Sequence, residues 1–327
     1  MNDATSNLPA TADATSNLPS IASAAMLGSL NISVWEGRKK DKTTEAEIVA
    51  SKGAASKRAA SVHKSLFAES PALEAIKALR GEARVWFNKV TLPWDDNGNR
   101  IITTAQYFEV MQDAARYEKR FHALVNTFVT AYPLEISKQA FELGALFDRN
   151  EYPKPEDIAH KFKFALNVNP LPMAGDFRID IGQEALKELQ ERCERDTQDR
   201  LKTAMSDAWL RVKTQVEWIR DRLQAVTEFD PNNVEEEKTV DDDGKVTGVK
   251  IIKKRRPKLH ESMLDNGIEL CGLLRDLNVT SDPQLEEARK MLEAALMPVD
   301  IDSLRESPQV QSSTKKKMED ILSKFSF

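Results

Sequence analysis

Few side chains of this sequence have the types and spacing that catalysis or metal binding requires. The chain has four histidines, which lie far apart at His63, His122, His160 and His260. None belongs to a paired-histidine zinc motif, and the chain has neither a phosphate-binding glycine loop nor a nucleophile elbow. The sequence therefore predicts no catalytic residue, no cofactor-binding residue and no metal ligand, and we expect a protein that is not an enzyme.

Two acidic stretches have the oxygen ligands that a divalent cation needs. Residues 95–99 read DDNGN, but the EF-hand frame with Gly98 at its sixth position requires an acid where Pro93 stands. We interpret this stretch as a turn. The runs Glu235–Glu237 and Asp241–Asp243 could hold an ion, but a solvated charge run is the better interpretation.

Two basic clusters have the charge to follow a phosphate backbone. The first contains Arg38, Lys39, Lys40, Lys57 and Arg58. The second contains Lys253, Lys254, Arg255, Arg256 and Lys258. Binding of this kind depends on salt and not on base sequence. The chain as a whole gives it no support, since 47 basic residues stand against 52 acidic ones.

Trp35 lies three residues before the first basic cluster. It could stack on a base or anchor the N-terminal segment to the rest of the protein. We interpret it as an anchor, and nucleic-acid binding stays an alternative.

Residues 182–229 predict one long helix, on which the remaining architecture depends. Its second half carries apolar residues at alternating steps of four and three, which is a coiled-coil seam. The seam residues are Met205, Trp209, Val212, Val216, Ile219, Leu223 and Val226. At 1.5 Å per residue the helix would be roughly 70 Å long, so its seam needs a partner.

The predicted fold class is all-α, with a helical body and a long antiparallel coiled-coil arm that carries a small β-hairpin. The predicted order along the chain is a disordered tail at 1–26, in which DATSNLP occurs twice, a body at 27–180, an arm at 181–298 and a C-terminal tail at 299–327 with a short amphipathic helix. The hairpin is expected at about 234–254.

Turn and spacing signals refine this scheme. Asp243–Gly244 is a type I′ hairpin signal, and the implied register places Glu237 opposite Lys250. Pro133 is expected to end one helix of the body and to precede another. Six aromatic residues at helical spacing are expected in the core: Trp86, Phe87, Phe108, Phe121, Phe128 and Phe141.

Composition places the chain among soluble proteins of the cytoplasm. Charged residues make up 30% of it, and no apolar run is long enough for a membrane span. The two cysteines, Cys193 and Cys271, cannot form a disulfide framework and suit a reducing compartment.

Four spaced segments resemble an uncharacterised family found in tailed bacteriophages and integrative conjugative elements. They are Leu30–Lys42, Leu92–Phe108, Glu142–Pro153 and Asn169–Gly182. The family has no assigned activity, so the resemblance assigns no site residue. Some relatives are encoded near a MoxR-type AAA ATPase and a von Willebrand A-domain protein, which implies an adaptor role and the cytoplasm of a host cell.

The sequence thus predicts an architecture better than a reaction. We expect a phage-type, non-catalytic interaction or scaffold protein. It would oligomerise or act as an adaptor for a protein partner, possibly an AAA ATPase. The alternative is a DNA- or RNA-binding protein of phage replication or recombination that uses the basic clusters.

Overall fold

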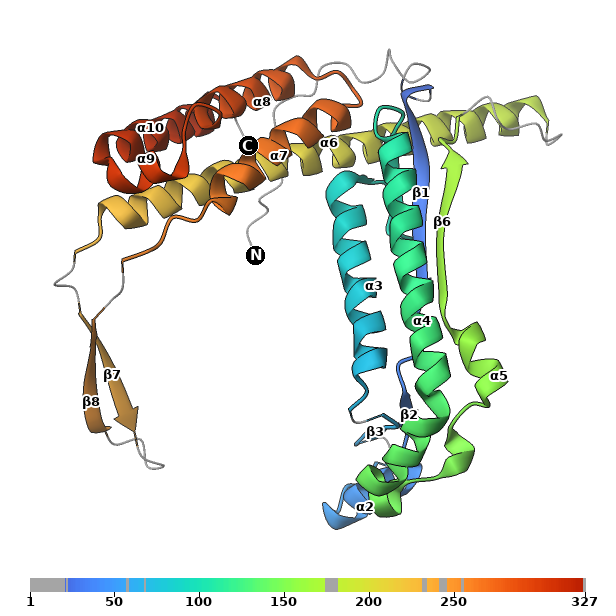
Figure 1. Ribbon diagram of the computed structural model, residues 1–327. Helices are drawn as coiled ribbons and strands as arrows, with labels where there is room; N and C mark the ends of the chain where they lie inside the picture. The colour runs from blue at the N-terminus through green and yellow to red at the C-terminus, as the bar shows by residue number, and fades with distance from the viewer. Residues whose placement is uncertain are drawn as a thin grey trace. The chain divides into compact units, whose positions relative to one another are not determined.

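A computed structural model describes residues 21, 23–56, 59–67, 69–173, 182–230, 234–240, 246–253 and 256–325. The chain divides into two compact units (Figure 1). The first unit consists of Met26–Thr91 and Asp95–Pro170. The second unit consists of Leu171–Phe327 together with Leu92–Trp94 and the segment up to Ala25.

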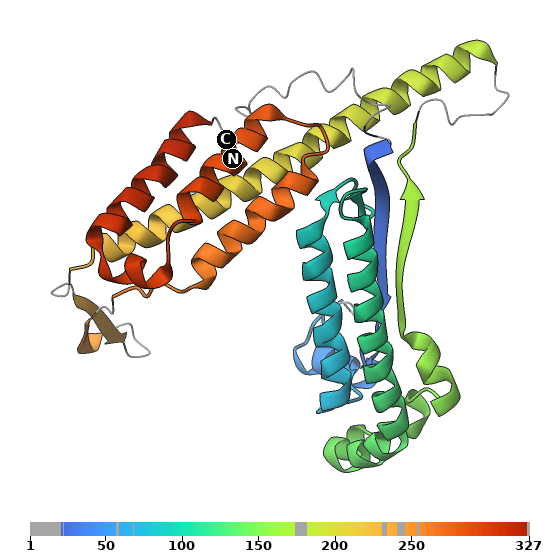
Figure 2. The same ribbon diagram turned by 45° about the horizontal axis from the view of Figure 1, so that its top comes forward.

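Two long helices and three strands form the first unit. Helix α3 (Pro71–Val90) begins at the N-cap Ser70, and α4 (Tyr107–Leu143) packs along it. Strand β1 (Ala25–Ser33) pairs antiparallel with β6 (Lys163–Pro170), and β5 (Asn99–Thr103) adjoins β1 on its other side. Figures 1 and 2 show β1 and β6 running beside α4. The core between the layers contains Ile76, Leu79, Phe121, Phe128 and Ile158, all at most 3% exposed.

Short elements complete this unit. Strand β2 (Arg38–Lys40) pairs with β3 (His63–Ser65), and α2 (Lys42–Ser51) lies between them in the chain. The segment after α4 contains α5 (Pro155–Ile158) and three short 3₁₀ helices, Gly144–Leu146, Arg149–Glu151 and Ala159–Lys161.

The second unit is a helical bundle. Its helices are α6 (Gln183–Thr227), α7 (Ser262–Leu277), α8 (Pro283–Leu296), α9 (Ile301–Glu306) and α10 (Pro308–Lys324). The C-terminal half of α6 is covered by α7, α8 and α10 (Figure 2). Asp282 caps α8, since its Oδ1 accepts hydrogen bonds from the backbone N–H groups of Gln284 and Leu285.

The predicted hairpin is present as β7 (Val234–Val240) and β8 (Val246–Lys253). Its antiparallel register pairs Glu237 with Lys250, as the turn signal predicted. The Asp243–Gly244 turn itself lies outside the described residues.

The all-α prediction is wrong, because the fold is mixed α/β. A four-stranded sheet has the order β4-β5-β1-β6, where β4 is Leu92–Pro93, and β2–β3 form a two-stranded sheet in addition to the β7–β8 hairpin. β1 and β6 are more than a hundred residues apart in sequence, so no local pattern announces their pairing. Strand β1 carries Gly28 at a position with no room for a side chain, because a Cβ there would lie 2.4 Å from Ile102 Cδ1.

Two further expectations about the body are corrected. Helix α4 runs through Pro133 without a break, because Phe128, Tyr132 and Ile136 on either side of the proline are buried in one core. Phe108 and Phe141 are not core residues, since they are 81% and 92% exposed. Phe87, Phe121 and Phe128 are buried as expected, and Trp86 packs against the core with part of its ring exposed.

The predicted segment boundaries can be compared with the two units. The first unit ends at Pro170, within ten residues of the predicted end of the body. Residues after 299 fold into the second unit as α9 and α10. Of the predicted N-terminal tail, residues 1–20 and 22 lie outside the described residues, while Ile21 is only 2% exposed and β1 begins at Ala25. None of the described helices is long and apolar enough to span a bilayer.

Candidate binding surfaces

The seam of α6 is the interior of the bundle. Its residues Met205, Trp209, Val212, Val216, Ile219, Leu223 and Val226 are each at most 4% exposed. The indole Nε1 of Trp209 donates a hydrogen bond to Asp282 Oδ2 at 3.1 Å, and its ring lies 5.6 Å from that of Phe325. The chain's own helices therefore fill the surface that a second chain would need.

An ion-paired arginine and a buried thiol belong to the interior of the bundle. The Arg289 guanidinium lies between Glu286 and Glu293, with its NH1 2.8 Å from Glu293 Oε2. Hydrogen bonds from Arg289 lower the pKa of Glu286 to about 2. Burial raises the pKa of the Cys271 thiol to about 12. These groups belong to the packing of the bundle and show no reactive arrangement.

The outward face of α6 carries two exposed apolar residues, Leu210 and Trp218, with Thr214 between them. Leu210, Thr214 and Trp218 are spaced by four residues, so they lie on neighbouring turns of one face. Leu210 is 58% exposed and Trp218 is 44% exposed. We call these three residues the outer stripe.

Three residues of the first basic cluster, Arg38, Lys39 and Lys40, form β2, and the two lysines are paired with acids. Lys40 Nζ is 3.0 Å from Glu45 Oε2. Glu151 forms ion pairs with two lysines, with Lys64 Nζ 2.5 Å from its Oε2 and Lys39 Nζ 3.9 Å from its Oε1. Arg38 is exposed beside them, while Lys57 and Arg58 lie outside the described residues. The positive charge of this cluster is therefore partly neutralised within the first unit.

Trp35 is packed against the core of the first unit. Its ring stands edge-on to Phe67 at 5.5 Å and to Tyr132 at 6.1 Å. These contacts hold the segment between β1 and β2 against α4. The ring therefore contributes to the aromatic core, and its position does not depend on a bound base.

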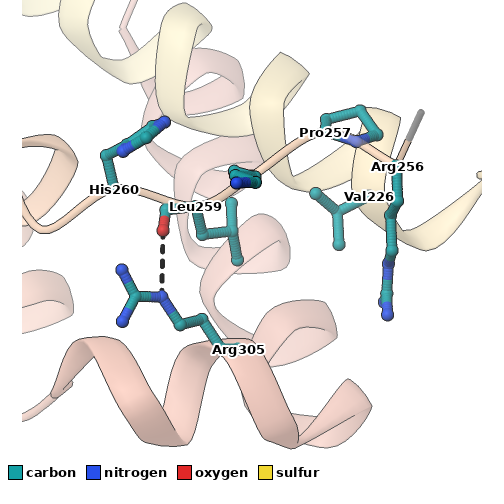
Figure 3. A pocket seen from close by; sticks show the side chains of 7 residues that line it. Val226, Arg256, Pro257, Leu259, His260 and Arg305 are labelled. Carbon is teal, nitrogen blue, oxygen red and sulfur yellow. Dashed lines mark hydrogen bonds between the residues drawn. The ribbon is translucent and has the colours of Figure 1, made fainter.

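The second basic cluster leads into a cavity of about 290 Å³ in the second unit (Figure 3). Lys253 ends β8, Lys254 and Arg255 lie outside the described residues, and Arg256 lines the cavity. The full lining is Val226, Arg256, Pro257, Lys258, Leu259, His260 and Arg305. We call residues 256–260 the connector, because they join the hairpin to α7, and the hollow the connector cavity.

Two arginines hold the connector in place. Arg222 of α6 donates from Nε and NH2 to the carbonyl oxygen of Lys258, at 3.1 and 2.8 Å. Arg305 of α9 donates from Nε to the carbonyl oxygen of Leu259 at 3.0 Å, the dashed line in Figure 3. Leu259 is itself 5% exposed. The cavity wall is thus fixed by the bundle on both sides.

The acidic turn at 95–99 uses its oxygens internally. Asp95 Oδ1 accepts hydrogen bonds from the backbone N–H groups of Asn97 and Asn99, both at 3.0 Å. Among the residues that the structure describes, no group of three or more histidine, cysteine or acidic side chains is placed to hold a metal ion. The side chains of the second acidic run, Glu235–Glu237, are not described, and Asp241–Asp243 lie outside the described residues.

Sequence reasoning missed Pro257, His260 and Arg305, which complete the connector cavity. It predicted a short amphipathic helix in the C-terminal tail, where α10 lies, but it did not predict that this helix closes the bundle. One signal for α10 was present, because Ser307 followed by Pro308 is an N-cap followed by a proline at the first helical position. No local signal places Arg305 beside Leu259, which precedes it by more than forty residues.

Comparison of the chain with protein-family models, with curated proteins and with solved structures returned no match.

Proposed function

We propose that the protein is a non-catalytic interaction protein that docks another protein on the second unit. The observation that carries this proposal is the outer stripe, in which Leu210 and Trp218 stay exposed although the bundle already has a complete core. Neighbouring exposed apolar side chains can mark a binding site, and tryptophan is enriched among the residues that dominate binding energy.

The outer stripe would supply part of the binding energy of such a contact. Burying the exposed parts of one leucine and one tryptophan contributes about 2–4 kcal/mol, and closely packed neighbours add to it. Polar side chains flank the stripe, including Arg211, which is paired with Asp207 at 2.8 Å. An apolar centre with a polar rim is the usual anatomy of a protein interface.

The covered seam favours a partner of a different kind over a second copy of this chain. Self-association through Met205–Val226 would require α7, α8 and α10 to leave α6, which exposes the whole bundle core. An adaptor role is therefore better supported than a coiled-coil oligomer. An AAA ATPase is the partner to test first, on the strength of the family resemblance alone.

Nucleic-acid binding is the less well supported alternative. Of the first basic cluster, Lys39 and Lys40 are paired with carboxylates, as is the neighbouring Lys64. A phosphate would have to compete with Glu45 and Glu151 for these cations.

Site-specific photo-cross-linking in the cytoplasm of the producing cell tests the proposal. The photoreactive residue benzoylphenylalanine replaces Trp218 in the full chain, and the control chain carries it at Val85, which is 70% exposed on α3. We expect a discrete cross-link to another protein from position 218 and not from position 85. Leu210→Glu in the same chain should reduce that product ~10-fold, because binding would then remove an unpaired carboxylate from water, which costs free energy.

Three outcomes would refute the proposal. Equal cross-linking from both positions would show a non-specific surface. A product unaffected by Leu210→Glu would show that the outer stripe is not the contact. A product that nuclease removes would favour the nucleic-acid alternative.

A further inference from the structure

The connector cavity combines an apolar floor with cationic walls. Val226 and Leu259 are 4% and 5% exposed and line it with their side chains, together with Pro257. Arg256, Lys258 and Arg305 supply three positive charges, and His260 adds an imidazole. None of the seven lining residues carries a carboxylate.

The two connector cations are available to a ligand. Arg256 and Lys258 are exposed, and neither side chain forms an ion pair with a carboxylate among the residues that the structure describes. Arg305 is partly occupied, since its NH1 donates to Asp302 Oδ1 at 3.0 Å and its Nε donates to Leu259. Figure 3 shows Arg256 and Arg305 approaching the cavity from different segments, Arg256 from the connector and Arg305 from α9.

The cavity wall needs little rearrangement to bind. The carbonyl oxygens of Lys258 and Leu259 are held by Arg222 and Arg305 from two different helices. A wall fixed in this way loses little conformational entropy when a ligand binds. The position of the cations is therefore set by the bundle, although their side-chain ends are free to adjust.

We propose that the connector cavity binds an acidic peptide segment of the partner, with one bulky apolar side chain over Val226 and Leu259 and carboxylates against Arg256 and Lys258. The inference rests on the proposed function, since it takes the partner to be a protein. The apolar floor matches the apolar side chain of such a segment, and the cationic rim matches its carboxylates. Arginine can bind a carboxylate through two parallel hydrogen bonds.

The same chemistry argues against a nucleic acid at this place. Proteins that hold single strands stack the bases on aromatic rings, and the lining has no phenylalanine, tyrosine or tryptophan. The volume of about 290 Å³ suits a side chain or two better than a nucleotide chain. A phosphate would also leave the apolar floor uncovered.

Fluorescence anisotropy on the full chain tests the inference at physiological salt. The probe is a fluorescein-labelled decapeptide of eight glutamates around two leucines. The variant R256E/K258E reverses both free cations. The matched control is K316E/K317E, which makes the same change of charge at exposed positions of α10 in the same unit.

We expect R256E/K258E to weaken binding of the probe at least ~10-fold and the control to change it less than ~2-fold. A second probe with serine in place of both leucines should bind ~10-fold more weakly, because it has no large apolar side chain to bury against the apolar floor. Far-UV circular dichroism checks that the variants are folded, and R256Q/K258Q should show an intermediate loss.

Several results would overturn the inference. Equal effects of the two double variants would show that the probe responds only to the overall charge of the protein. Equal binding of the leucine and serine probes would show that the apolar floor does not contribute to binding. An octathymidine strand or inorganic phosphate that displaces the probe at a lower concentration than the unlabelled peptide would assign the cavity to phosphate. If the peptide fails to bind while the Trp218 cross-link persists, the inference about the cavity is wrong and the proposed function stands.

Discussion

Trp209→Phe tests whether the seam is filled by the chain itself. The indole of Trp209 is 1% exposed, and its N–H donates to the buried carboxylate of Asp282, which also caps α8. Phenylalanine keeps most of the apolar volume but removes the donor. A hydrogen bond to a charged group contributes about 1.5–3 kcal/mol, and the smaller ring leaves space beside Phe325 that costs about 1 kcal/mol more. Asp282 keeps two backbone donors, so we expect a loss near the lower end, about 2–3 kcal/mol.

The assay is urea unfolding followed by far-UV circular dichroism, with attention to the transition of the second unit. The matched control is Trp218→Phe on the same helix, which should change the free energy of unfolding by less than ~0.5 kcal/mol because Trp218 is 44% exposed. The unfolding midpoint should not depend on protein concentration, since an oligomeric seam would be stabilised by mass action. A Trp209→Phe variant as stable as the control, or a midpoint that rises with concentration, would refute the intramolecular seam.

Two further predictions concern groups inside the bundle. Hydrogen bonds from Arg289 are the chief reason that the pKa of Glu286 falls from its ordinary value of 4.5 to about 2 in the folded state. The ionised carboxylate therefore stabilises the fold fully above pH 4.5, and this stabilisation is lost as the pH falls through about 2. The urea midpoint of the second unit should therefore fall less steeply over this range in Glu286→Gln than in the unaltered chain, and equal slopes would contradict the ion pair. Burial raises the pKa of Cys271 to about 12, so a thiol reagent at pH 8 should label the half-buried Cys193 in the native protein and both cysteines only in denaturant. Rapid labelling of two native thiols would show that the bundle core opens.

The candidate surfaces were only partly accessible from sequence. The basic residue Arg256 was identified by charge alone, and it does line a cavity. The outer stripe was missed, although the spacing of the seam already leaves Leu210 and Trp218 off the buried face of the helix. Which face of a helix is covered depends on the helices that return to it, and α10 is almost a hundred residues away from Trp218.

Local patterns determined much of the second unit. The alternating apolar spacing of Met205–Val226, the turn signal of the hairpin and the Asp282–Pro283 cap each depend on interactions within a few residues, so they can be recognised one segment at a time. Periodicity shows that a seam must be covered, because an exposed apolar stripe of that length is unfavourable in water.

Tertiary structure alone decided what covers the seam and whether the body is all helical. The pairing of β1 with β6 and the packing of α10 on α6 join residues more than eighty positions apart. Such contacts depend on the shape and burial of both partners at once, and no single segment carries that information. For the same reason Pro133 stays inside α4, where the burial of Tyr132 and Ile136 outweighs the lost hydrogen bond of one turn.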